Sequence, residues 1–210
     1  MKSRLLPFVA VFMLSHSMNA AIMVVSNRVD GITDALYVDG ANNPLTTGNV
    51  LLGVFLAADF DVVANQSNLI DLMGNFTSLA SGLIYLDHVS SPTPLAGYAD
   101  AAPVDIGVVG TGSVYYNKVL YSIVFDGSSP ETSTSYALLR IGTIMEDVGA
   151  TTQTYSSDPW GAESILVGDF INNYPNAFSM LQLAPIPEPT TALLSGVGLL
   201  TFLSHRRRRH

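Results

Sequence analysis

Three prolines spaced two residues apart place the tightest limit on how this chain can fold. Pro185, Pro187 and Pro189 each lack a backbone N–H and hold φ fixed, so neither a helix nor a central strand can run through them. The sequence therefore predicts that the folded body ends near residue 184. The next segment, residues 190–203, is apolar and uncharged, and four arginines follow it at positions 206–209.

The apolar segment is short for a membrane span but has the composition of one. As a helix, residues 190–204 would extend about 22 Å, whereas roughly 20 residues normally cross a bilayer core. A soluble C-terminal helix is the alternative, but it would carry a polar face, and the polar residues here are only small Ser, Thr and Gly. We therefore expect a C-terminal transmembrane helix whose arginines stay on the cytoplasmic side.

Three features in this order resemble a known sorting signal. They are the tripeptide Pro187-Glu188-Pro189, the short hydrophobic helix, and the cluster of Arg206, Arg207, Arg208 and Arg209. Together they resemble the PEP-CTERM sorting domain over about residues 185–209. The resemblance implies recognition by an exosortase, a membrane-embedded enzyme of Gram-negative bacteria. It also implies that residues 185–210 are a removable sorting tail, and that the protein passes from the inner membrane to the cell surface or the exopolysaccharide matrix.

The N-terminus has the pattern of a secretory signal peptide. Lys2 and Arg4 precede an apolar run over residues 5–14, and small residues follow at Ala20 and Ala21. Cleavage after Ala20 is the expected processing step, which makes residues 1–20 a signal helix for Sec-type export machinery. A retained N-terminal anchor is the alternative, but the apolar run is too short to span a bilayer comfortably.

The body between these two ends is strongly acidic. Residues 21–184 contain sixteen Asp and Glu against three basic side chains, Arg28, Lys118 and Arg140, so their formal charge is near −13. Such a charge repels nucleic acid and suits a soluble extracellular protein. The chain has no cysteine, so disulfides and thiolate chemistry are excluded and the domain must rely on its core.

Short apolar, β-branched runs alternate with Gly, Pro, Ser and Asn throughout the body, which predicts a mainly β domain over residues 21–184. The expected strands cover residues 22–25, 35–38, 49–56, 83–86, 105–109, 114–125, 136–144, 165–167 and 177–183. The third is apolar on both faces and so predicted to be central, whereas residues 119–125 alternate as a half-buried strand does. The fold expected is an antiparallel β-sandwich or jelly-roll-like domain.

One segment has helical rather than β periodicity. Apolar side chains recur at spacings of three, one, three and three, at Leu69, Leu72, Met73, Phe76 and Leu79. The pattern predicts one amphipathic helix over residues 67–80, with an N-cap within residues 65–67 and a stop at Gly82. We interpret its apolar stripe as core that packs on the sheet.

The body contains little catalytic material. His88 is its one histidine, so neither a zinc site nor a Ser-His-Asp triad has enough partners, and no glycine-rich phosphate loop follows a strand. Asp59 and Asp61 would lie about 7 Å apart on one strand face, near the separation of a glycosidase pair, but a solvated edge is the simpler interpretation. We therefore expect no enzymatic activity, no catalytic residue and no cofactor.

Two binding hypotheses remain open. Asp30, Asp34 and Asp39, with Asn42 and Asn43, form an oxygen-rich cluster that suits calcium, although ordinary turn formation explains the same residues. The aromatic side chains that could stack on sugar rings are Trp160, Tyr115 and Tyr116. The sequence thus favours an exported surface or matrix protein with a structural or adhesive role, with a carbohydrate-binding module as the alternative and a glycan-active hydrolase as the third choice.

Overall fold

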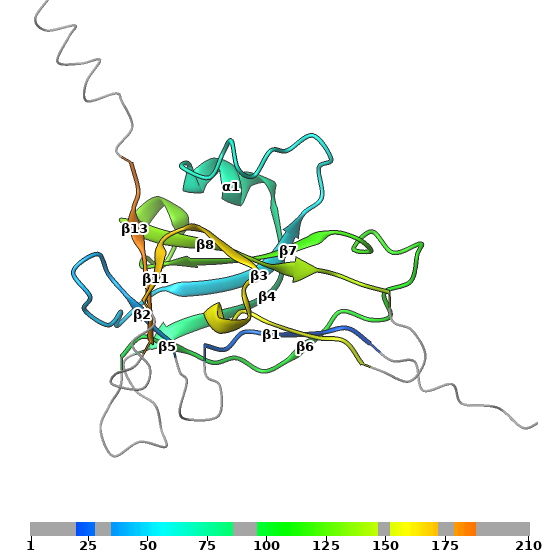
Figure 1. Cartoon of the computed structure of the whole chain (residues 1–210), viewed down its shortest axis with the longest axis horizontal. Coiled ribbons are helices and arrows are strands. Elements are labelled where there is room, and N and C mark those ends of the chain that lie inside the picture. The colour runs from blue at the N-terminus through cyan, green and yellow to red at the C-terminus, as the bar shows by residue number, and fades with distance from the viewer. Residues whose placement is uncertain (1–19, 28–34, 86–95, 147–151, 172–178, 188–210) are drawn as a thin grey trace, which may run out of the picture.

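The computed structural model describes residues 20–27, 35–85, 96–146, 152–171 and 179–187 (Figure 1). These residues form a mainly β domain with one α-helix, α1 (Leu69–Asn75), and two short 3-10 helices, η1 (Pro130–Thr132) and η2 (Pro159–Gly161). The strands are β1 (Ile22–Val24), β2 (Ala35–Val38), β3 (Asn49–Phe55), β4 (Phe76–Tyr85), β5 (Tyr98–Ala99), β6 (Val104–Asp105), β7 (Val119–Phe125), β8 (Ser135–Thr143), β9 (Thr154–Ser156), β10 (Ser164–Val167), β11 (Asp169–Ile171), β12 (Ser179–Gln182) and β13 (Ala184–Pro185). The mainly β prediction is confirmed.

The largest sheet has the order β10-β8-β7-β3-β4-β5, and β13 also pairs with β8. Every pair in it is antiparallel. Strand β3 pairs with β4 on one side and with β7 on the other along nearly its whole length. The central position predicted for this strand is therefore confirmed.

Hydrophobic clusters lie against both faces of the central strands β3 and β7. In β3, Val50, Leu52 and Val54 belong to one hydrophobic cluster, whereas Phe55 belongs to a second. Strand β7 alternates in the same way, since its even-numbered Leu120 and Val124 join the first cluster and its odd-numbered residues join the second. The prediction of a half-buried strand at residues 119–125 is wrong, because layers of the fold cover it on both sides.

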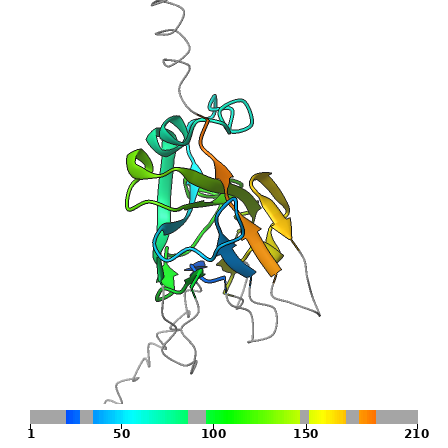
Figure 2. The same ribbon diagram turned by 90° about the vertical axis from the view of Figure 1, so that its left-hand side faces the viewer.

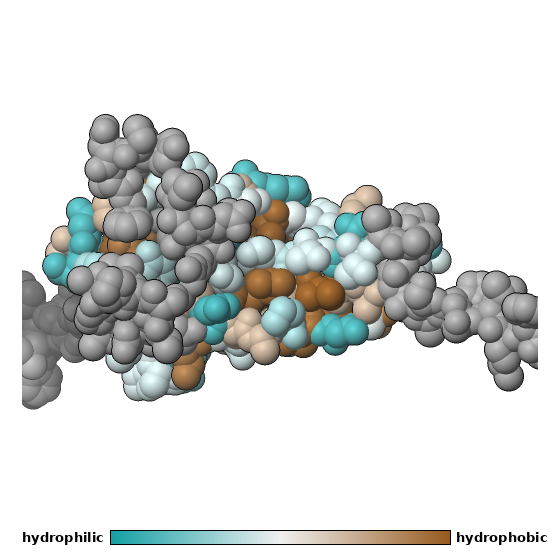
Figure 3. Space-filling model, turned by 90° about the horizontal axis from the view of Figure 1, so that it is seen from below, coloured by the Kyte–Doolittle hydropathy of each residue, from teal (hydrophilic) through white to brown (hydrophobic). Residues whose placement is uncertain are grey.

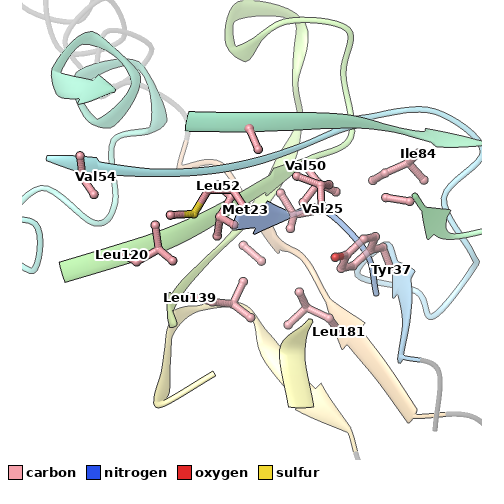
Figure 4. Close-up of a cluster of buried hydrophobic side chains, with 14 of the residues drawn as sticks. Met23, Val25, Tyr37, Val50, Leu52, Val54, Ile84, Leu120, Leu139 and Leu181 are labelled. Atoms are coloured by element: carbon pink, nitrogen blue, oxygen red, sulfur yellow. The ribbon is translucent and has the colours of Figure 1, made fainter. Parts of the chain in front are cut away.

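Two three-stranded sheets cover the first face, in the orders β6-β1-β9 and β11-β12-β2. The core beneath the large sheet contains the side chains of Met23 in β1, Val25 directly after that strand, Tyr37 in β2 and Leu181 in β12 (Figure 4). Each small sheet contains one parallel pair, β1 with β9 and β12 with β2, which join segments far apart in the sequence. An entirely antiparallel arrangement, as the sequence suggested, is thus not what the domain adopts.

Helix α1 and the segment before it cover the second face, at the top of the molecule in Figure 1. The side chain of Asn68 caps the helix by accepting a hydrogen bond from the Asp71 N–H (3.2 Å). The helix ends at Asn75, and β4 begins at the next residue. The prediction of a helix over residues 67–80 is therefore correct for its first half and wrong for its second.

Most predicted strands exist, with shifted ends. Of the strand predicted over residues 83–86, residues 83–85 are the end of the longer β4. Residues 105–109 contain only the second residue of β6, and the strand predicted to begin at residue 114 begins at Val119. No sequence pattern predicted β5, β9, β11 or β13, which have two or three residues each.

The two predicted membrane-directed helices, the signal helix at residues 1–20 and the transmembrane helix at residues 190–204, fall outside the described residues apart from residue 20. Among the helices that the structure does describe, none has both the length and the apolar character that crossing a bilayer requires.

Candidate functional site

The described chain leaves the domain through β13, at the point where the proline-rich segment begins. Ala184 and Pro185 lie opposite Tyr136 and Ser135 of β8, and the Ile186 N–H donates to the Thr134 carbonyl (2.8 Å). Pro185 donates no hydrogen bond, so it suits the outer side of this short strand. Pro187 is exposed and directly follows Ile186, whose N–H bonds to the Thr134 carbonyl.

A single carboxylate organises the segment that holds β13. One oxygen of Asp126 accepts hydrogen bonds from the backbone N–H groups of Thr134 (2.8 Å) and Ser135 (3.1 Å). Its other oxygen accepts from the two hydroxyl groups of the same residues, at 2.6 and 2.8 Å. Burial acts to raise the pKa of Asp126, but these hydrogen bonds outweigh it and hold the pKa below its ordinary value. An ionised Asp126 therefore fixes the strand end on which Ile186 docks.

Ile186 also connects the exit of the chain to α1. Its side chain packs against the second hydrophobic cluster, which includes Tyr136, Leu69 and Leu72. The Tyr136 hydroxyl donates to the Gln66 carbonyl, in the segment before α1. Burial raises the pKa of Tyr136 to about 12, so the phenol remains a neutral donor at physiological pH. The helical layer and the exit strand are thus held by the same residues of β8.

An open groove of about 570 Å³ lies beside β13. Its lining combines the carboxylates of Asp39 and Asp126 with hydroxyl groups and with Leu183 and Pro185. Asp39 accepts hydrogen bonds from the N–H groups of Ala41 (2.8 Å) and from Asn43, which lowers its pKa. Since both carboxylates already accept several hydrogen bonds from their own loops, the structure explains their presence without a bound ligand.

Of the residues predicted for the sorting signal, Pro187 alone is described, and it lies on the surface. Glu188, Pro189 and the arginines at 206–209 lie outside the described residues. Sequence reasoning did not single out Asp126. In the sequence, Asp126 stands directly before a Gly and ahead of a Ser- and Thr-rich turn, but this pattern is also typical of an ordinary loop.

The carboxylate pair proposed for glycan hydrolysis is not on a strand. Asp59 and Asp61 lie in turns that follow β3, and both are exposed. Asp61 accepts a hydrogen bond from the Ala64 N–H (3.0 Å), so it stabilises its own turn. The expectation that both carboxylates share one strand face is therefore wrong.

Of the residues considered for calcium binding, Asp39, Asn42 and Asn43 lie in one tight turn. Asn42 has φ of 65°, a left-handed conformation that Asn tolerates in turns. Asp30 and Asp34 lie outside the described residues, as does His88. Within the part of the chain that the structure describes, no group of three or more His, Cys, Asp or Glu could hold a metal ion.

The aromatic residues proposed for sugar stacking are partly buried. Trp160 packs edge-to-face on Phe170 (ring centroids 5.1 Å apart, planes at 79°), and its indole nitrogen is buried. Tyr115 and Tyr116 pack against the first hydrophobic cluster. The structure therefore gives these three side chains a packing role and does not gather them into one exposed platform.

A family model of the PEP-CTERM protein-sorting motif matches residues 185–209. Residues 185–209 are a PEP-CTERM protein-sorting motif. The motif marks an exported protein that an exosortase processes at the membrane, in agreement with the resemblance seen in the sequence. No curated protein and no solved structure matches the chain. The PEP-CTERM motif overlaps the domain, because its first two residues, Pro185 and Ile186, contact β8.

Proposed function

We propose that the protein is a non-enzymatic surface or matrix protein whose acidic β domain reaches its destination through cleavage of the PEP-CTERM tail. Exosortase is its processing partner, and Sec-type export machinery delivers it to the inner membrane of a Gram-negative bacterium. The mature domain then has a structural or adhesive role at the cell surface or in the exopolysaccharide matrix. The match of the sorting motif to residues 185–209 is the observation that carries this proposal.

The arrangement at the end of the domain supports cleavage between the domain and the membrane segment. The sheet holds the chain as far as Ile186, and Pro187 is exposed one residue later. Pro187, the first residue of the Pro-Glu-Pro tripeptide, therefore lies outside the folded core, where a processing enzyme can reach it. The body's net negative charge and lack of cysteine also fit a soluble protein outside the cytoplasm.

Mass spectrometry of the protein recovered from its native host tests the proposal. We expect a mature C-terminus between Pro187 and Pro189, in the surface or matrix fraction. An intact tail, with Arg206–Arg209 present in a stable inner-membrane protein, would contradict it.

A variant pair separates recognition of the tripeptide from general damage. Substituting alanine for all three of Pro187, Glu188 and Pro189 is expected to leave the uncleaved precursor in the membrane fraction. The matched control replaces Pro130 and Glu131, a Pro-Glu pair in η1 on the surface, and should be processed normally. If both variants were processed equally, the tripeptide would not be needed for recognition, contrary to the proposal.

Association with exopolysaccharide is the finer part of the proposal, and the alternative of a dedicated carbohydrate-binding module makes a separate prediction. Such a module needs an exposed aromatic platform, whereas Trp160 is partly buried against Phe170. Co-sedimentation of the mature domain with host exopolysaccharide, compared between wild type and Trp160→Ala, distinguishes the two. Binding that survives Trp160→Ala favours a matrix protein, and binding lost with a folded variant favours the module.

A further inference from the structure

The position of β13 limits how far the domain can stand from the membrane before cleavage. Ile186 is fixed to the sheet by a hydrogen bond and by packing, and the apolar segment begins at Thr190. The three residues between them can separate the two positions by at most about 14 Å, even when fully extended. If the apolar segment lies in the bilayer, which rests on the proposed function, the end of the domain that carries β13 must lie at the lipid headgroups.

The same end of the domain carries α1. Ile186 packs in one cluster with Leu69 and Leu72 of α1, and Tyr136 of β8 bonds to the segment before the helix. Figure 2 shows α1 and the preceding segment at the top of the molecule, where β13 also ends. We call α1 together with residues 57–68 the α1 end.

Two large apolar side chains are exposed on the α1 end. Val63 is 58% exposed and Ile70 is 49% exposed, although their neighbours Val62 and Leu69 are buried. Because Val62 and Leu69 already cover the sheet, Val63 and Ile70 next to them face outward. The transfer of large aliphatic side chains out of water lowers their free energy, so this surface favours contact with an apolar environment.

We propose that the α1 end is a membrane contact surface of the precursor, with Val63 and Ile70 facing the headgroup and upper acyl region of the bilayer. The occupant follows from the chain itself, because the three residues before Thr190 hold the end of the domain that carries β13 and α1 close to the lipid. Exposure alone does not single out this end. The opposite side of the molecule, with β1 and β6, also shows apolar patches (Figure 3), and Val104 there is 37% exposed.

The charge of the α1 end makes this contact depend on the tether. Its exposed carboxylates are Asp59, Asp61 and Asp71, and Glu131 of the adjoining η1 adds a fourth. Anionic lipid repels them, so the free domain has little affinity for a membrane. A short tether instead holds the α1 end at an effective concentration on the order of millimolar or above. Cleavage beyond Ile186 therefore releases the domain from the lipid as well as from its anchor.

Single-cysteine labelling tests the contact, because the chain has no cysteine of its own. Ile70→Cys and Val63→Cys carry an environment-sensitive fluorophore, and Val104→Cys and Leu83→Cys, at exposed apolar residues elsewhere, are the matched controls. The full chain is reconstituted in vesicles of phosphatidylethanolamine and phosphatidylglycerol that contain spin-labelled lipid as quencher. We expect severalfold stronger quenching at positions 63 and 70 than at 83 and 104, and no quenching at any position in a chain that ends at Ile186.

Flotation of the vesicles separates the possible failures. A full chain that floats but is quenched equally at all four positions, or at none, contradicts the membrane contact and leaves the anchoring tail intact. A full chain that does not float contradicts the anchoring on which the contact rests. Persistent quenching at position 70 in the chain that ends at Ile186 contradicts the tether dependence.

Discussion

At the scale of single residues, Asp126 is the side chain on which the end of the domain most depends. It accepts four hydrogen bonds from Thr134 and Ser135, the residues beside β13. We expect Asp126→Asn to lower the free energy of unfolding by roughly 1–3 kcal/mol, because hydrogen bonds to a charged group contribute more than neutral ones and partial solvent access weakens them. Urea unfolding of residues 21–186 measures the change. Asp59→Asn, at an exposed carboxylate, is the matched control and should change stability by less than about 0.5 kcal/mol.

The same substitution has a predictable pH dependence. Folding lowers the pKa of Asp126, so its ionised form stabilises the native state at pH values above the unfolded pKa of about 3.9. This contribution disappears as the pH falls through the lower, folded-state pKa. The difference in stability between wild type and Asp126→Asn should therefore be constant from pH 5 to about pH 8 and shrink toward pH 2. A difference that grows in acid would show that the hydrogen bonds do not favour the carboxylate.

Residue roles were the hardest part to predict from the sequence. The sorting tripeptide is a local pattern, so it was found, and the family comparison supports it. The functions considered for Asp59, Asp61 and Trp160 instead depend on which side chains meet across the fold. The turns after β3 expose both carboxylates, and η2 presses Trp160 against Phe170. No spacing in the sequence contains that information.

At the scale of elements, the boundary between α1 and β4 shows why periodicity predicted too long a helix. The apolar positions Leu69, Leu72 and Met73 lie on the sheet side of α1, as predicted. Phe76 continues the helical spacing, but as the first residue of β4 it packs against Phe55 of β3 (ring centroids 5.2 Å apart). Pairing of β4 with all seven residues of β3 outweighs the weak helical preference of the sequence after Gly74. Nonlocal pairing of this kind also creates the short strands that local patterns missed.

The contact between the two layers of the first core can be tested at Gly82 of β4. A Cβ atom at Gly82 would lie 2.8 Å from Cγ1 of Val25 and 3.3 Å from Cβ of Ala101, so the small sheet approaches the large sheet closely here. We expect Gly82→Ala to destabilise the domain by about 1–3 kcal/mol, as overpacking does. Val25→Ala alone also destabilises it by removing core volume. The double variant should be more stable than the sum of the two changes predicts, by about 0.5 kcal/mol or more. A double-mutant cycle measured in urea checks this, and strict additivity would mean that the layers are not in contact at Gly82.

At the scale of the whole molecule, the folded domain continues directly into the PEP-CTERM motif, with no linker between them. Hydrophobic clusters lie on both faces of the central strands, where the small sheets cover one side and α1 covers the other. The strand that carries the chain out of this core is already part of the PEP-CTERM motif. A flexible linker would let the domain move freely away from the membrane. Here the motif begins within the folded domain, so the position of cleavage decides whether the residues that contact the sheet are kept or lost.

The last prediction follows from that arrangement. A chain that ends at Leu183 lacks the two residues of β13 and the Ile186 side chain, whereas a chain that ends at Ile186 keeps them. We expect residues 21–183 to be less stable than residues 21–186 by roughly 2–4 kcal/mol, the sum of one partly buried aliphatic side chain and a few backbone hydrogen bonds. Residues 21–189 should match residues 21–186 within about 0.5 kcal/mol, since Pro187 is exposed and adds no backbone donor. Urea midpoints of the three chains decide the matter. Equal stability of the two shorter chains would show that β13 is dispensable, and that cleavage on either side of it leaves the same mature domain.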